Sequence, residues 1–292
     1  RVDSMTARTV HPAPDVLNVG FRNRLGESPW WDGTALSWVD IFGLRVHRAL
    51  LDGSDASGFA TPGQPGFAIP DGDGFVVGLP DGVWHHSTSA DAWTQRWVAS
   101  HDPDVQRIND GKTDPAGRLW FGTMTYDESA PVSSLFRLDA AGASEQMGGV
   151  ITSNGLGWSP VGTTMYYADS PARVIWAFDY DPSLGAISGR RVFTRDPEGY
   201  FPDGLSVDDE GCVWSAKWNG GKVVRYSPDG RVDRVLEVPV ARPTSVAFAG
   251  SDRSTLAITT ADPGDPALAH ELDGLILLVP SGTTGPLLAS PR

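Results

Sequence analysis

The sequence predicts an all-β protein, a six-bladed β-propeller built around a central channel. Three observations predict this fold: abundant turn residues, many short strands, and a longer repeat that spans the chain. Gly occurs 34 times and Pro 23 times in 292 residues, and convincing helical periodicity is scarce. A turn followed by a short apolar or alternating run recurs throughout, as in proteins made of many short strands.

The longer repeat consists of six stretches with one shape: a lead-in, a turn that contains Gly, and a strand that ends in small or polar residues. In chain order they are WWDGTALSWVD (30–40), IPDGDGFVVGL (69–79), TDPAGRLWFGT (113–123), WSPVGTTMYYAD (158–169), VDDEGCVWSAK (207–217) and FAGSDRSTLAIT (248–259). Successive units begin roughly 40–50 residues apart, which is the spacing of four-stranded propeller blades.

A second strand often follows each unit and closes with another turn. Examples are GLRVHRALLDG, SSLFRLDAAG, RVIWAFDYDP and GKVVRYSPDG. Six such units fill the chain, so we expect one domain over residues 1–292 without a linker. Residues 1–10 are expected to be a cloning remnant or a flexible N-terminus. A double-sheet sandwich is the competing all-β architecture, and the repeat period counts against it.

Composition and charge exclude several classes of protein. The formal net charge is −13, with 36 acidic and 23 basic residues. Such a surface repels phosphate backbones and anionic lipids, so we expect no nucleic-acid and no membrane partner. Cys212 is the only cysteine, which excludes an internal disulfide and a cysteine-based zinc site. The N-terminal stretch lacks the apolar core of a secretory signal, so a cytoplasmic location is expected.

One register of the repeats carries oxygen-bearing side chains. About eight residues before the turn glycine stand Asn109, Asn154 and Asp203 in the third, fourth and fifth repeats. In the first repeat Glu27 precedes Gly33 by about six residues, an offset that a tighter connection would absorb. Equivalent positions of propeller blades lie at equal distances from the axis. We therefore expect Glu27, Asn109, Asn154 and Asp203 to converge at the mouth of the channel.

These four side chains form a set of hard oxygen donors, suited to Ca²⁺, Mg²⁺ or Mn²⁺. Without a cation, Glu27 and Asp203 would repel each other and one of them would have to bind a proton. Each position alone has a simpler interpretation, because Asn-Gly and Asp-Gly are ordinary turn pairs. Four of them in one register favour a metal site. We expect one divalent cation, Ca²⁺ first, with Zn²⁺, Mg²⁺, Mn²⁺ and Fe²⁺ as alternatives.

The same stretches resemble the senescence marker protein/gluconolactonase family, also called regucalcin-like. The motifs that carry this resemblance run almost end to end: LGESPWWD (25–32), RINDGKTDPAGRLWFGTM (107–124), SNGLGWSPVGTTMYYADS (153–170), FPDGLSVDDEGCVWSAKWNGGKVVRYSPDG (201–230) and RPTSVAFAG (242–250). The resemblance implies a six-bladed propeller with one divalent metal at its channel mouth. It also implies sugar lactonase activity, with more distant relatives that hydrolyse phosphotriesters.

The resemblance further implies roles for individual residues. The positions that match the metal ligands of the family are Glu27, Asn154 and Asp203. The positions that match residues close to the substrate are Arg107, Asn109 and Asp127. Two positions depart from the family pattern: Ser28 replaces the usual glycine, and Tyr126 stands where a more acidic residue is expected.

We therefore expect a divalent-metal-dependent hydrolase that opens the ring of a sugar-derived or similar small lactone. Asp203 is the candidate general base, and the alternative is that it is a metal ligand only. The same metal site could instead hydrolyse a phosphotriester or another ester, or the propeller could bind calcium without catalysis. Four tryptophans are candidates to line the pocket: Trp30, Trp31, Trp158 and Trp218. The substrate's identity and the oligomeric state stay open.

Overall fold

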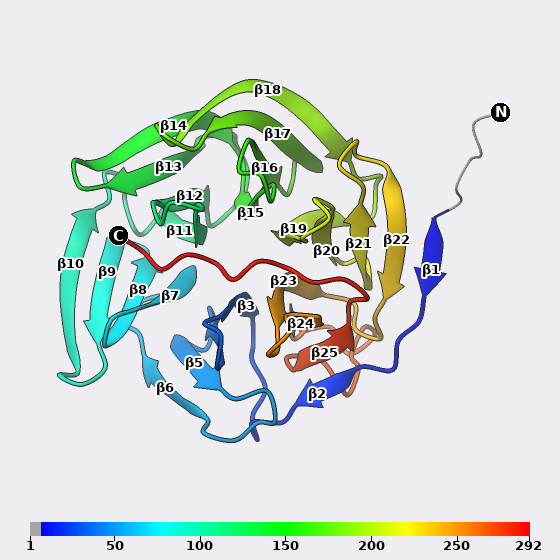
Figure 1. The fold of residues 1–292 in the computed structure, drawn as a ribbon. Helices are drawn as coiled ribbons and strands as arrows, with labels where there is room; N and C mark the ends of the chain where they lie inside the picture. Colours follow the sequence, from blue (N-terminus) through cyan, green and yellow to red (C-terminus); the bar gives the residue numbers. More distant parts are fainter. Residues whose placement is uncertain (1–6) are drawn as a thin grey trace.

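The computed structural model describes residues 7–292 and confirms the predicted six-bladed β-propeller. Six sheets are arranged in a ring, and one strand at the edge of each sheet lies next to the central axis (Figure 1). Strands are the only regular elements in the described residues. Within that part of the chain, no helix has the length and apolar character needed to cross a bilayer.

The first three blades each contain four consecutive strands. Blade 1 consists of β3 (Gly26–Trp31), β4 (Leu36–Asp40), β5 (Arg45–Ala49) and β6 (Ser57–Ala60). Blade 2 consists of β7 (Phe67–Asp71), β8 (Gly74–Leu79), β9 (Gly82–Ser87) and β10 (Ala92–Val98). Blade 3 consists of β11 (Gln106–Thr113), β12 (Leu119–Thr125), β13 (Ser133–Asp139) and β14 (Gly142–Val150).

Blade 4 also contains four consecutive strands, whereas blades 5 and 6 each include a strand from the N-terminal segment. Blade 4 consists of β15 (Ser153–Trp158), β16 (Thr164–Asp169), β17 (Val174–Asp181) and β18 (Ala186–Arg195). Blade 5 contains β19 (Phe201–Val207), β20 (Val213–Trp218), β21 (Lys222–Tyr226) and β22 (Val232–Glu237). Blade 6 contains β23 (Pro243–Ala249), β24 (Thr255–Thr260) and β25 (Ile276–Pro280).

The six predicted repeats correspond to one recurring hairpin. Each quoted stretch spans the turn between the first and second strand of a blade, from β3–β4 to β23–β24. The predicted second strands are β5, β13, β17 and β21. The repeat thus marks the part of each blade nearest the axis, which is also where the sequence places the polar residues.

The N-terminal segment closes the ring. The strand β2 (Asp15–Leu17) pairs antiparallel with β25 and becomes the outermost strand of blade 6. The strand β1 (Arg8–Val10) pairs parallel with β22 and extends blade 5. Residues 8–10 are therefore attached to the propeller, whereas the rest of the stretch expected to be flexible lies largely outside the described residues. That all 292 residues form one domain stays a prediction.

The hydrophobic core is divided into six clusters, one between each pair of neighbouring blades. Trp214 of blade 5, for example, packs in one cluster with Phe248 and Leu256 of blade 6. Trp38, Trp120 and Trp214 are among the largest fully buried side chains. Because each sheet buries both faces against its neighbours, the blades hold one another in place and fix the residues on the inner strands.

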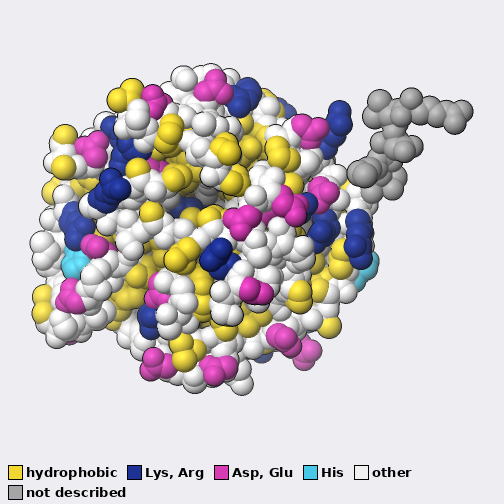
Figure 2. Space-filling model, viewed as in Figure 1, with side chains coloured by type: hydrophobic (Ala, Val, Ile, Leu, Met, Phe, Trp, Pro, Cys, Tyr) yellow, Lys and Arg dark blue, Asp and Glu magenta, His cyan; other side chains and the backbone are white. Residues whose placement is uncertain are grey.

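The C-terminal segment crosses the end of the channel at which the inner strands finish. It runs across the centre of the ring in Figure 1, where it is drawn red. Its contacts include a hydrogen bond from Asp209 N to Thr284 O (2.8 Å) and one from Arg292 N to Gly117 O (3.0 Å). In the same view, Figure 2 shows hydrophobic side chains around the centre and acidic side chains scattered over the surface.

Candidate metal and substrate site

A cavity of about 450 Å³ lies at the other end of the channel, where the inner strands begin. It is lined by five of the residues singled out from the sequence, Glu27, Arg107, Asn109, Asn154 and Asp203. They come from four blades: β3, β11, β15 and β19. The predicted convergence of the four oxygen-bearing side chains on one channel mouth agrees with this geometry.

Irregular strand pairing occurs at or beside each of the four oxygen-bearing residues. Asn109, Asn154 and Asp203 lie within the shifts, whereas Glu27 pairs with Val39 and directly precedes one. The register of the inner hairpin shifts between Glu27 and Trp30, between Ile108 and Asp110, between Ser153 and Leu156, and between Pro202 and Leu205. A β-bulge leaves a residue outside the ladder and re-aims its side chain. The hairpin of blade 2 pairs without a shift, and its register position holds Gly66 instead of a polar residue.

Close approach of the inner strands requires glycine next to two of the polar residues. A Cβ atom on Gly155 would lie 2.6 Å from Asp203 O, and one on Gly204 would lie 1.9 Å from Ser245 Oγ. Both distances are shorter than van der Waals contact, so no larger residue fits without movement of the backbone. Glycine after Asn154 and Asp203 therefore brings blades 4, 5 and 6 together around the cavity.

Hydrogen bonds fix the orientation of both amides. Asn109 Nδ2 donates to Ser153 O (2.7 Å), and Asn154 Nδ2 donates to Ser170 Oγ (3.1 Å). Ser170 Oγ in turn donates to Pro202 O of the next blade (2.7 Å). Because the nitrogen of each amide is bonded to the protein, its carbonyl oxygen is the atom left to face a ligand. The carbonyl oxygen of Asn154 also accepts from Gly155 N (3.2 Å) and keeps a second lone pair.

Two buried carboxyl groups lie in hydrogen-bonding contact at the same mouth, on Glu27 and Asp203. Burial, with the nearby carboxylate of Asp110, raises the pKa of Glu27 to about 8. Burial and the neighbouring Glu27 and Asp110 raise the pKa of Asp203 well above its usual range. Asp203 Oδ1 is buried and has no hydrogen-bond partner. Such a group is costly unless a proton or a cation compensates its charge.

Basic side chains lie beside and beneath the carboxylates. Arg107 is 4% exposed, and burial lowers the pKa of its guanidinium to about 10, so it stays charged near neutral pH. Its Nη1 donates to Ile108 O (3.1 Å). Deeper in the channel, Lys112 Nζ donates to Leu205 O (2.7 Å), and its charge lowers the pKa of Asp110 against the larger effect of burial.

The donor set fits a divalent cation. Glu27 and Asp203 supply two negative charges, and Asn109 and Asn154 supply two oriented carbonyl oxygens, all of them hard ligands. The unpartnered Asp203 Oδ1 is the atom that a cation would satisfy. Burial first, and repulsion between neighbouring carboxylates second, raise both carboxyl pKa values, and a divalent ion would offset both effects.

A second group of metal-ligand types occurs in the described residues, at Asp208, Glu210 and Cys212 of blade 5. Both carboxylates of this group already bind Arg225, whose Nε donates to Asp208 Oδ2 (2.9 Å) and whose Nη2 donates to Glu210 Oε2 (2.6 Å). Burial raises the pKa of Cys212 to about 11, so its thiol is protonated at neutral pH. We read this group as an ion-pair cluster and not as a metal site.

The structure does not bring Asp127 into the cavity. Its carboxylate accepts hydrogen bonds from Ser129 N (3.2 Å) and Ser129 Oγ (2.8 Å) in an exposed turn. The residues on either side of it, Tyr126 and Glu128, line the cavity instead. Glu128 Oε2 accepts a hydrogen bond from Thr152 Oγ1 (2.7 Å), which fixes its carboxylate at the mouth.

Several lining residues were not singled out from the sequence. Most lie in the segments that lead into or between strands, where no repeat register exists: Arg24, Gln64, Glu128, Arg242 and Asp262. Phe201 is the first residue of β19. Of the four candidate tryptophans, Trp218 lines this cavity. Trp30 and Trp31 are buried in the clusters between blades, and Trp158 packs between blades 3 and 4.

Two other grooves, of about 580 and 590 Å³, lie farther from the axis. One is lined by residues of blades 4 and 5, such as Tyr166 and Asp229, and the other by residues of blades 1 and 2, such as His47 and His86. Neither contains any of the convergent residues on the inner strands. The axial cavity is therefore the candidate site.

This chain is similar to known proteins both in sequence and in fold. A family model described as the SMP-30/Gluconolactonase/LRE-like region matches residues 25–262. A 6-deoxy-6-sulfogluconolactonase of Pseudomonas putida is 36% identical over 242 residues, covering 81% of this chain and 83% of the relative. An L-arabinolactonase of Azospirillum brasilense is 38% identical over 277 residues, covering 90% of each chain.

The similarity extends to a solved structure. A calcium-binding protein, regucalcin, from Agrobacterium tumefaciens superposes with a TM-score of 0.91 at 26% sequence identity. The superposition covers 98% of this chain and 100% of that protein. The whole ring is therefore common to both.

Proposed function

The chain belongs to the SMP-30/gluconolactonase/LRE-like family, and from that premise we propose that it hydrolyses a sugar-derived lactone with one divalent cation. The observation that carries the proposal is the convergence of Glu27, Asn154 and Asp203 from three blades on one cavity. Within it, the buried Asp203 Oδ1 has no partner from the protein. Relatives over most of the chain are named for sugar lactones, which supports the same substrate class.

Glu27, Asn154 and Asp203 would hold the cation, with the carbonyl oxygen of Asn109 beside it. Ca²⁺ is our first choice because all donors are oxygens and because the regucalcin of A. tumefaciens is described as calcium-binding. When bound, a divalent cation supplies Lewis acidity that polarises a carbonyl oxygen. It also balances the two buried carboxylates, so the site would bind the neutral ring without excess negative charge.

The chain's own residues would then orient the reactants. Arg107 presents a charged, buried guanidinium that would hold a substrate hydroxyl or stabilise negative charge on the carbonyl oxygen. Asn109 would orient the substrate or the attacking water. The oxygen of that water bonds to the lactone carbonyl carbon, the ring C–O bond breaks, and the ring oxygen leaves as a hydroxyl. The product is a hydroxy acid.

The proton released by the water needs an acceptor, and Asp203 is the candidate. Its carboxylate lines the cavity, so an oxygen not bound to the cation would accept the proton from the water and pass it on to the leaving ring oxygen. The alternative is that Asp203 only holds the cation. Asp203→Asn keeps an oxygen donor but cannot act as a base, so a variant that binds the cation without turnover would favour the first role.

Activity measurements on the metal-stripped protein test the proposal. We expect no hydrolysis of a panel of aldonolactones until Ca²⁺, Mg²⁺, Mn²⁺, Zn²⁺ or Fe²⁺ is added singly, with acid release as the readout. Asp203→Ala should lower kcat/KM by about 10³-fold. Asp181→Asn, which removes an exposed carboxylate in the β17–β18 turn, is the matched control. Rates like those of the unmodified protein in Asp203→Ala would refute this assignment.

Two other outcomes would replace the proposal. Faster hydrolysis of a phosphotriester than of every lactone would make the protein an esterase on the same site. Cation binding without turnover of any lactone or ester would make it a calcium-binding propeller. Arg107 and Glu128 favour the enzymatic reading, because bare cation binding does not need a buried guanidinium and a further carboxylate around the cavity.

A further inference from the structure

Three arginines line the axial cavity: Arg107, which is buried, Arg242, which is half-buried, and Arg24, which is exposed. Only neutral acceptors hold them: Arg107 and Arg24 each donate from Nη1 to a backbone carbonyl, that of Ile108 (3.1 Å) and that of Phe42 (3.2 Å). Among residues 7–292, no carboxylate lies within ion-pair distance of any of the three. Three positive charges in one cavity stand out in a protein whose net charge is −13.

Arg24 and Arg242 lie on the same wall. Two adjacent residues of one segment bind their backbones, since Asp262 N donates to Arg24 O (3.1 Å) and Ala261 N donates to Arg242 O (3.1 Å). An isolated antiparallel bridge between Leu25 and Ala261 joins the same two segments. The two arginines therefore stand on either side of residues 261–262, where blade 6 meets blade 1.

Arg242 is held in a defined orientation. Its Nε donates to Asn219 Oδ1 (2.8 Å), its Nη1 donates to Pro263 O (2.8 Å), and its guanidinium lies 4.7 Å from the centre of the Trp218 ring. These contacts leave Nη2 without a protein acceptor. Arg24 uses only Nη1, which leaves Nε and Nη2. Each side chain thus keeps donors for a ligand.

This wall lies across the ring from Arg107. Blade 3 is the third blade from blade 6 in a ring of six, so β11 faces blade 6 across the axis, next to its junction with blade 1. A substrate whose carbonyl lies at the axis would therefore extend its far end either to Arg107 or to the arginine pair. Arg107 and Asn109 would contact one end of the substrate from blade 3. The other end of the substrate would then lie against the wall that carries Arg24 and Arg242.

The charge balance of the cavity favours an anion at that wall. If one divalent cation neutralises Glu27 and Asp203, as the proposed function requires, the three guanidiniums outnumber the remaining carboxylates, Glu128 and Asp262. Asp262 is exposed and its Oδ1 accepts from Gly264 N (2.9 Å). Guanidinium groups bind carboxylate, phosphate and sulfonate oxygens through paired, charge-assisted hydrogen bonds, which neutral hydroxyls do not match.

We propose that Arg24 and Arg242 form a subsite for an anionic substituent, so that the preferred substrate is an acidic sugar lactone. The substituent is a carboxylate, phosphate or sulfonate at the carbon farthest from the ring carbonyl. This inference rests on the proposed lactonase function and specifies its substrate class. Arg24 and Arg242 select the substrate, while the residues on the inner strands act on the ring.

Competition between neutral and acidic lactones tests the subsite. The panel is gluconolactone and its analogues with a carboxylate, a phosphate or a sulfonate at carbon 6, which also distinguishes the three anions. We expect kcat/KM to be about 10–100-fold higher for at least one acidic lactone. In Arg24→Gln/Arg242→Gln this preference, measured as the ratio of kcat/KM for the acidic and the neutral lactone, should fall to near one.

Controls separate the subsite from net charge and from folding. Arg231→Gln removes one charge from an exposed turn and should leave the preference unchanged. Arg24→Lys keeps the charge without the planar fork and should retain only part of the preference. The melting temperature of the double variant, compared with that of the unmodified protein, verifies that it folds.

Binding without turnover distinguishes failure of the subsite from failure of the proposed function. Calorimetry with the open-chain acids, which do not react, should show tighter binding of the acid with an anionic group at carbon 6 than of gluconate. The double variant should bind both equally. Equal binding of both acids by the unmodified protein would overturn the subsite. If no lactone is hydrolysed but the binding preference holds, the lactonase function fails and the subsite stands.

Discussion

At residue scale, Ser28 occupies a position whose backbone conformation favours glycine. Its φ of +48° lies in the left-handed region, which costs an L-residue about 1 kcal/mol. The hydroxyl offsets part of that cost, because Ser28 Oγ donates to the buried Asp110 Oδ1 (2.9 Å). The departure from the family glycine noted in the sequence is thus a balance between backbone strain and a hydrogen bond.

Two substitutions at this position separate these effects. Ser28→Ala keeps the strain and loses the hydrogen bond, whereas Ser28→Gly loses the bond but relieves the strain. We expect Ser28→Gly to be more stable than Ser28→Ala by about 1 kcal/mol in urea unfolding. The opposite order would mean that the backbone at residue 28 is not strained.

Also at residue scale, His47 should make the stability depend on pH. It stacks on Phe21 and Trp38, and its burial, with the charge of Arg45 and against that of Asp40, lowers the pKa of its imidazole from 6.5 to about 4. Between these two values the unfolded chain binds a proton that the folded protein does not. Stability contributed by the neutral ring is therefore lost as the pH falls from 6.5 towards 4.

His47→Phe removes this proton from the balance and keeps an aromatic ring in the stack. From pH 6.5 to 5, the unmodified protein should lose about 2 kcal/mol more of unfolding free energy than the variant. Urea unfolding of both proteins at the two pH values measures the difference. Equal losses would show that His47 is protonated as readily in the folded state as in the unfolded one.

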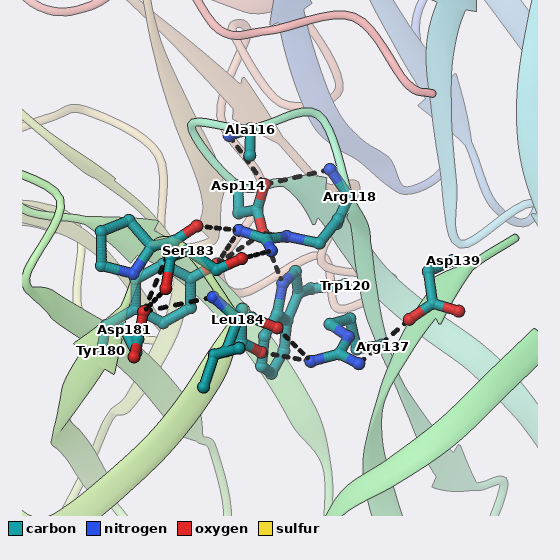
Figure 3. Close-up of polar contacts among 12 residues, drawn as sticks. Asp114, Ala116, Arg118, Trp120, Arg137, Asp139, Tyr180, Asp181, Ser183 and Leu184 are labelled. Atoms are coloured by element: carbon teal, nitrogen blue, oxygen red, sulfur yellow. Dashed lines mark hydrogen bonds and ion pairs between the residues drawn. The ribbon is translucent and has the colours of Figure 1, made fainter. Parts of the chain in front are cut away.

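At the scale of elements, two inner hairpins share an Asp-x-x-Gly-x-x-Trp turn. Figure 3 shows the blade 3 example, in which the buried Asp114 receives bonds from Ala116 N (2.8 Å), Trp120 Nε1 (3.2 Å) and Arg118 Nε (2.7 Å). In blade 5, Trp214 Nε1 donates to Asp208 Oδ2 in the same way (2.9 Å). The carboxylate ties the turn to the second strand and so sets the hairpin register.

Replacement of this carboxylate should destabilise the propeller. Asp114→Ala leaves the donors of Arg118, Trp120 and Tyr180 without their acceptor, and we expect a loss of about 3–5 kcal/mol. Asp181→Ala, in the exposed turn shown in the same figure, should cost less than about 1 kcal/mol. Chemical denaturation compares them, and similar losses in both would contradict the role given to the turn.

The inner hairpins were predictable from the sequence because they combine turn glycines, alternating strands and a fixed spacing. The strands β1 and β2 were not, since each has only three residues and takes its partner from the far end of the chain. For the same reason, no pattern in the sequence around β2 indicates that this strand completes blade 6. Pairing of this kind depends on the ring having formed.

The residues of the candidate site likewise fall into those that the sequence predicted and those that it did not. Glu27, Asn109, Asn154 and Asp203 stand in one register of the repeats, and that register predicted their convergence. Arg24, Glu128 and Arg242 reach the cavity from connecting segments, whose course no repeat determines. Asp127 was placed at the substrate by resemblance alone. A turn that bonds its carboxylate to Ser129 directs Asp127 outward and leaves the cavity to Tyr126 and Glu128.

At the scale of the whole molecule, ring closure holds the candidate ligands in place. The N-terminal β2 completes blade 6, and six hydrophobic clusters join neighbouring blades. At the end of the channel remote from the cavity, Thr113 Oγ1 binds Ala289 O of the C-terminal segment. Ligands from separate blades thus stay close although the buried carboxylates repel each other.

We expect Glu27 and Asp203, far apart in the chain, to bind one cation together on the propeller axis. Calorimetric titration of the metal-stripped protein with Ca²⁺ tests it directly, with Glu27→Gln and Asp203→Asn for comparison. We expect the unmodified protein to bind one cation per chain, and each variant to bind Ca²⁺ at least about tenfold more weakly than the unmodified protein does. Equal affinity in all three proteins, or no binding of any divalent cation, would contradict it.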